Sequence, residues 1–128
     1  MNCENREALR PMMLACAETA AIYQYLLDLY PGKCRDRLQK LFEGEMETVA
    51  CLKGVAVLWG QTPGKMRFPP APREPSRKLL ERAYYSTGRA AGAYADRSGE
   101  PEVGRIFGSL AARAEDRCLI LAEILGRM

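Results

Sequence analysis

The sequence has no histidine among its 128 residues. It therefore lacks the side chain that most often acts as a general base and as a ligand to transition metals. Long apolar runs are missing too, and no stretch approaches the roughly 18 apolar residues that a membrane-spanning helix needs. The first ten residues carry charges instead of the apolar run of a secretion signal. We therefore expect a cytoplasmic protein with no membrane partner.

The charge balance gives little reason to expect nucleic-acid binding. There are 19 basic and 16 acidic residues, for a net charge of +3, so the overall electrostatic field is weak. The densest basic stretch runs from Lys65 to Arg82. We interpret this stretch as a solvated loop and helix end.

Cysteine usage favours a reducing compartment. The five cysteines are an odd number, they are irregularly spaced, and no two of them form a CxxC pair. Free thiols are the simplest interpretation of Cys3, Cys16, Cys34, Cys51 and Cys118.

Apolar residues recur at steps of three and four in four segments, which is the period of one helical face. The predicted helices cover residues 7–30, 33–59, 75–97 and 101–125 of a single domain that spans residues 1–128. Pro11 suits a first helical position, so the regular part of the first helix could begin there. No segment alternates as a strand does.

The connections predict the topology. Two of them are short, which favours two helical hairpins. The middle connection, 61–74, contains four prolines. At about 3.1 Å per residue, a dozen such residues span roughly 37 Å, close to the length of a helix of about 26 residues. We therefore predict an all-α, antiparallel four-helix bundle with a long crossover between the second and third helices.

The two hairpins also echo each other in sequence. Glu18 precedes Tyr25 by the same number of residues as Thr87 precedes Tyr94. In the second helix of each hairpin, the tetrapeptide Glu45–Thr48 corresponds to Glu115–Cys118. Similar spacing in both hairpins indicates two related halves.

This arrangement resembles the rubrerythrin branch of the ferritin-like family, in which glutamates and Glu-x-x-His motifs on four helices hold two metal ions. The stretches FEGEMETVACLKGVAVLWGQTP and FGSLAARAEDRCLILAEIL are similar to its metal-binding helices with the histidines replaced. The resemblance implies Glu18, Glu45 and Glu115 as inward carboxylate ligands and Cys118 as a thiol ligand. Thr87 and Thr48 occupy the remaining ligand positions. The cofactor is then either absent or an iron, manganese or zinc ion.

Three carboxylates in a dry interior need a neutralising partner. That partner could be a metal ion, a proton, or an arginine such as Arg89 or Arg113 reaching inward. Cys118 could be a metal ligand or an inert buried thiol. Tyr25 and Tyr94 could hydrogen-bond the carboxylates or simply pack in the core. Glu47 and Cys51, four residues apart, could form a shifted ligand pair.

Three functions remain open at this point. The first is a ferritin-like bundle with a degenerate metal site that acts by binding or assembly, as a homodimer or larger homo-oligomer. The second is a metal-dependent oxidoreductase that uses Glu18, Glu45, Glu115 and Cys118. The third is a bundle that binds a small ligand in the interhelical space left by Gly88 and Gly92.

Overall fold

The computed structural model describes the backbone of residues 3–128 and the side chains from Leu9 onward. Its helices are α1 (Cys3–Leu27), α2 (Gly32–Leu58), α3 (Ser76–Asp96) and α4 (Gly104–Gly126). Residues 3–128 contain no strand. The prediction of an all-α chain built from four helices is confirmed.

Two predicted helix starts are wrong. The helix α1 begins at Cys3 and contains Pro11, so it extends through the proline with the loss of one backbone hydrogen bond. The helix α4 begins at Gly104 instead of at Pro101. Residues 101–103 form a turn instead, which is closed by a 2.9 Å hydrogen bond from the Gly104 amide to the Glu100 carbonyl. Glu102 has a φ of 68° within this turn, which no helical residue adopts.

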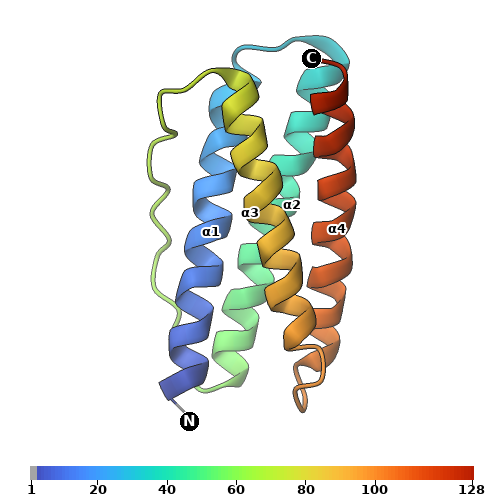
Figure 1. Ribbon diagram of the computed structural model, residues 1–128. Helices are drawn as coiled ribbons and strands as arrows, with labels where there is room; N and C mark the ends of the chain where they lie inside the picture. The colour runs from blue at the N-terminus through green and yellow to red at the C-terminus, as the bar shows by residue number, and fades with distance from the viewer. Residues whose placement is uncertain (1–2) are drawn as a thin grey trace.

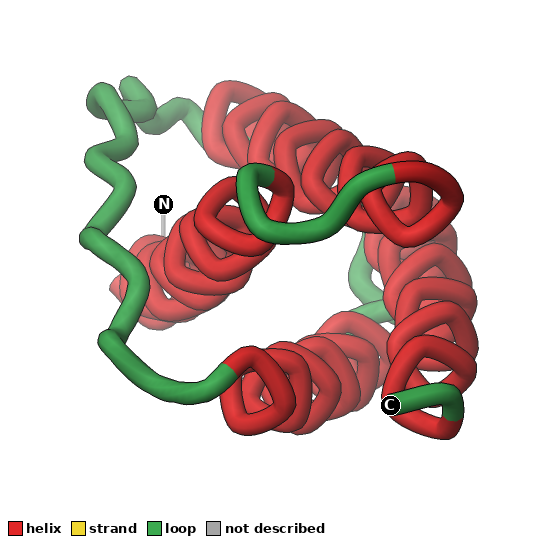
Figure 2. Tube along the Cα trace, turned by 90° about the horizontal axis from the view of Figure 1, so that it is seen from above, coloured by secondary structure: helices red, strands yellow, loops and turns green. Residues whose placement is uncertain are grey.

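Figure 1 shows how the chain passes through the bundle. It rises in α1 and descends in α2, and an extended crossover returns it along the outside to the other end, where α3 begins. The chain then descends in α3 and rises in α4. Seen from above, the four helices stand around a common centre, and the crossover runs outside them (Figure 2). The two hairpins pack against each other, α1 against α3 and α2 against α4.

The core consists of two apolar clusters, one in each half of the bundle. The first cluster is centred on Leu52, Tyr94 and Phe107, and the second on Tyr23, Leu41 and Leu121. Along every helix, the residues of one cluster come before a short segment at the middle of the bundle, and the residues of the other cluster come after it. That segment is where the buried polar side chains lie.

None of the helices formed by residues 3–128 combines the length and the apolar character needed to cross a membrane. The expectation of a cytoplasmic location stays a prediction.

Candidate functional site

The middle of the bundle contains a buried polar layer, which we define as Thr19, Glu45, Thr48, Thr87 and Arg117. All four helices contribute to it, and it separates the two apolar clusters. Charged residues are almost never fully buried unless they are paired. The presence of both an acid and a base in this layer therefore needs an explanation.

The central contact of the polar layer is an ion pair between α2 and α4. Glu45 is 3% exposed and Arg117 is 6% exposed, and Oε1 of the glutamate lies 3.3 Å from Nε of the arginine. Among the described residues, this nitrogen has no partner in hydrogen-bonding geometry. The contact is therefore an electrostatic pairing that compensates two charges removed from water.

Gly44 provides the space in which the arginine lies. A β-carbon placed on Gly44 would lie 3.0 Å from Cδ of Arg117 and 3.3 Å from its Nη1. The first distance is shorter than ordinary van der Waals contact, so any larger residue at this position would press on the arginine side chain. Consecutive residues of α2 thus supply both the room for the guanidinium and its counter-charge.

Hydroxyl and thiol groups surround the ion pair, and several of them bond within their own helix. Thr48 Oγ1 donates to the Gly44 carbonyl at 2.9 Å, and Thr19 Oγ1 donates to the Ala15 carbonyl at 2.8 Å. These bonds to carbonyls one turn back satisfy the threonine hydroxyls without help from a ligand.

Two tyrosines approach the polar layer from opposite sides. The Tyr94 hydroxyl lies 3.4 Å from Sγ of Cys16. The Tyr23 hydroxyl and Oγ1 of Thr87 are buried without a hydrogen-bond partner among the described residues. Along the sequence, Tyr94 follows Tyr23 at the same offset as Thr87 follows Cys16. The two halves of the bundle therefore place related pairs around the layer.

Burial dominates the acid–base properties of these groups. It raises the pKa of Glu45 above its ordinary value, and the Arg117 guanidinium opposes that rise. Burial, together with the nearby Glu45 carboxylate, raises the pKa of Cys16 to about 12. Burial and the Glu45 carboxylate also raise the pKa of Tyr23. The pKa of Tyr94 is raised by burial, then by Cys16, and less by Glu45. At neutral pH the thiol and both phenols are therefore uncharged donors.

The structure does not bring the four predicted ligands together. Glu45 is buried, but Glu18 and Glu115 are exposed, which corrects the inward orientation that the family resemblance implied for them. Cys118 is half-buried, and its thiol lies 3.9 Å from the Tyr84 carbonyl. Among residues 9–128, no three acidic or cysteine side chains lie close enough together to hold a metal ion.

Helix phase explains this outcome. The buried residues Leu110, Ala114, Arg117 and Leu121 of α4 follow one another at steps of four, three and four, and Glu115 lies one position outside that series. On α1 the series runs through Cys16, Ala20 and Tyr23, which leaves Glu18 and Tyr25 facing solvent. Tyr23, and not Tyr25, is thus the internal counterpart of Tyr94.

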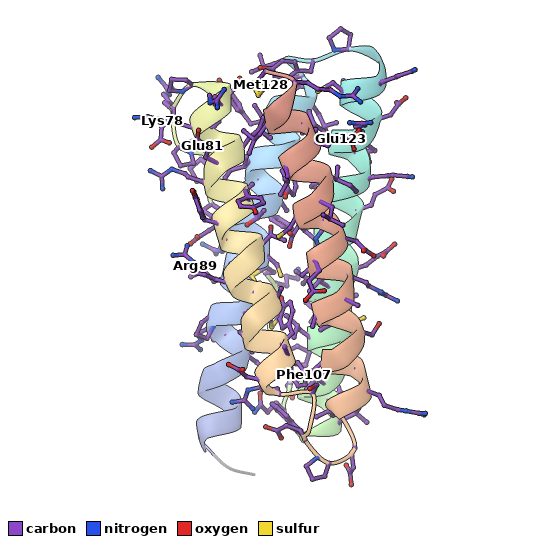
Figure 3. All side chains as sticks on the ribbon, turned by 45° about the vertical axis from the view of Figure 1, so that its right-hand side comes forward. Lys78, Glu81, Arg89, Phe107, Glu123 and Met128 are labelled. Atoms are coloured by element: carbon purple, nitrogen blue, oxygen red, sulfur yellow. The ribbon has the colours of Figure 1, made fainter. Side chains whose placement is uncertain are left out.

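An arginine does reach inward, but it is not one of those named from the sequence. Arg89 and Arg113 are both exposed, and Figure 3 shows Arg89 directed away from the bundle. Arg117 was missed because a charged residue is not expected in an apolar series. Cys118 continues the apolar series equally well, four residues after Ala114 and three before Leu121, so spacing alone does not distinguish position 117 from position 118.

The described cysteines Cys16, Cys34, Cys51 and Cys118 are free thiols, as predicted, and the side chain of Cys3 lies outside the described residues. Glu47, proposed as the partner of Cys51 in a shifted ligand pair, is exposed.

The layer's donor set does not fit the iron, manganese or zinc ion that the family resemblance implies. Glu45 is its only acidic member, and the threonine hydroxyls are neutral, weakly coordinating groups. The guanidinium of Arg117 already pairs with the one carboxylate, and its positive charge repels a divalent cation.

Comparison of the chain with protein-family models, with curated proteins and with solved structures finds no match in any of the three.

Proposed function

We propose that this protein is a ferritin-like bundle in which an internal ion pair replaces the metal centre, and that it acts by binding or assembly without catalysing a reaction. The observation that carries this proposal is the buried pair of Glu45 and Arg117 in the middle of the bundle. A guanidinium supplies there the positive charge that a metal ion would supply to the carboxylate.

The relation to ferritin-like proteins is supported by three features. A long crossover joins α2 to α3, two hairpins echo each other in sequence, and polar side chains from all four helices meet at mid-length. Bundles of that family build their metal sites at this level from inward-facing side chains. The polar layer keeps the location of such a site while its ligands have changed.

The outer surface supports the second half of the proposal. Along the last turns of α2, Ala50, Gly54, Val57 and Leu58 are all exposed, with Val57 at 60% and Leu58 at 61%. Their spacing places them on one side of the helix. Adjacent exposed apolar side chains commonly mark a contact surface for a protein partner. We take this face of α2 as the contact between copies in a homodimer or larger homo-oligomer.

Metal analysis tests the first half of the proposal. Protein purified without an affinity tag would be incubated with Fe²⁺, Mn²⁺ or Zn²⁺, dialysed and analysed for metal, beside Glu45→Gln and Glu115→Ala. We expect no stoichiometric metal in any of the three proteins. One metal per chain in the parent, lost in both variants, would contradict the proposal and favour the metal-dependent oxidoreductase.

Sedimentation velocity tests the second half. We expect the parent to sediment as a dimer or larger species and Leu58→Glu to sediment as a monomer, because a charge in the contact disfavours association. Leu119→Glu is the matched control, since Leu119 is also exposed but lies on α4. A parent that stays monomeric at all concentrations would contradict assembly.

A further inference from the structure

A groove lies at the end of the bundle where α2 begins and α4 ends. Its volume is about 500 Å³, which is within the usual range for small-molecule sites. Tyr30, Cys34, Ile124 and Met128 form its apolar part. Ile124 is 6% exposed and belongs to the adjoining apolar cluster, so the floor of the groove is continuous with the core. Figure 3 shows Met128 and Glu123 at this end of the molecule.

The rim of the groove is cationic. Lys33, Arg37 and Arg127 line it, and among the described residues no acidic side chain does. Two of these cations pair with Glu123, whose Oε1 lies 3.0 Å from Nη2 of Arg37 and 3.1 Å from Nη2 of Arg127. One carboxylate oxygen is thus shared by two guanidinium groups. Lys33 forms no ion pair within the described part of the chain.

We propose that this groove binds a small anionic amphiphile, a carboxylate that carries a linear alkyl chain. The side chains at the groove supply three positive charges against one shared negative charge, which leaves an excess to attract an anionic head group. Arginine and lysine donate charge-assisted hydrogen bonds to carboxylates. The alkyl chain lies over Tyr30 and Ile124, where it removes apolar surface from water.

The inference is independent of the proposed function, because the groove shares no residue with the polar layer or with the exposed face of α2. A bundle without an internal metal site can carry a ligand at its end whether or not it assembles. Failure of one proposal therefore leaves the other intact.

Binding would be measured by calorimetry with dodecanoate below its micelle-forming concentration, and with dodecyltrimethylammonium as the cation of matched chain length. We expect one dodecanoate per chain and no binding of the cation. Lys33→Glu and Arg127→Glu should each weaken dodecanoate binding about tenfold or more, because each replaces an attractive charge by a repulsive one. Lys78→Glu is the control, since Lys78 is exposed at the same end of the bundle but lies on α3 outside the groove.

Cys34 provides a second measurement that reports position. It lines the groove, whereas Cys51 is half-buried elsewhere on α2. Dodecanoate should slow alkylation of Cys34 by iodoacetamide and leave Cys51 unchanged. Equal binding of both amphiphiles, unchanged affinity in both groove variants, or unprotected Cys34 would overturn the proposal. Sedimentation with phosphatidylglycerol vesicles without binding of free dodecanoate would also overturn it, because the occupant would then be a membrane surface.

Discussion

Breaking the internal ion pair from one side should cost this bundle a large part of its stability. In Arg117→Met the thioether keeps the contact of the arginine stem with Gly44, but Glu45 loses its only cationic partner among the described residues. Removing one partner of a buried ion pair typically costs about 3–5 kcal/mol. Because domains of this kind are stable by roughly 5–15 kcal/mol, the variant should be close to unfolding.

The double variant Glu45→Leu/Arg117→Met separates the charge effect from packing. Replacing a whole buried pair by apolar residues is often neutral, or stabilising by about 1–4 kcal/mol. Urea denaturation followed by far-ultraviolet circular dichroism at pH 7 would give the free energy of unfolding of the parent, both single variants and the double variant. We expect each single variant to be far less stable than the double variant. If Arg117→Met costs under about 1 kcal/mol, and the double variant is the least stable of the four, the reasoning is refuted.

Three further predictions concern the charge of Glu45, two helical glycines and the reactivity of the cysteines. Since burial raises the pKa of Glu45, the folded state binds its proton more tightly than the unfolded state does. The free energy of unfolding of the parent, relative to that of Glu45→Gln, should therefore be greatest below the ordinary pKa near 4.5 and fall as pH rises toward the pKa of Glu45 in the folded state. Urea denaturation of both proteins from pH 3 to pH 8 checks this. A relative stability of the parent that increases with pH would contradict it. Gly88→Ala should stabilise α3 by about 1 kcal/mol, because that glycine has open space around it and lies outside the proposed contact between copies. Gly44→Ala should stabilise the protein less than that, or destabilise it, because the added methyl group presses on Arg117. Equal changes in the melting temperature of the two variants would argue against the packing described for Arg117. In the native protein at pH 8, iodoacetamide should modify the half-buried Cys34 and Cys51 well before Cys16, whose pKa is raised to about 12; mass spectrometry of the peptides tests this, and early modification of Cys16 would contradict it.

The sequence predicted much of the fold because apolar periodicity and proline placement act locally. The positions of Pro31, Gly60 and the four prolines of the crossover separated the helices correctly to within a few residues. The sequence left open whether the regular part of the first helix begins at Pro11; it does not, because a single missing hydrogen bond does not outweigh the packing of a long helix against two neighbours. Pro101 misled the prediction of the fourth helix, because its good local start was overridden by the turn at Glu102.

The site was less predictable because it depends on helix phase at single-residue resolution. Glu45 was placed correctly in the core, whereas Glu18 and Glu115 are exposed. One residue on a helix turns a side chain by about 100°, so an error of one position moves a ligand from the core to solvent. Arg117 shows the opposite error, since its charge kept it out of the apolar series, which Cys118 continued instead, although Arg117 is the internal residue.

The most direct measurement of the central claim is the exchange of the arginine Nε–H protons in ¹⁵N-labelled protein by NMR. The buried pair predicts one Nε–H resonance that exchanges slowly with water, shifts in Glu45→Gln and is absent from Arg117→Met. If every arginine Nε–H exchanges rapidly, or if the slow resonance is unaffected by Glu45→Gln, Arg117 does not pair with Glu45 in the core and the account of the polar layer is wrong.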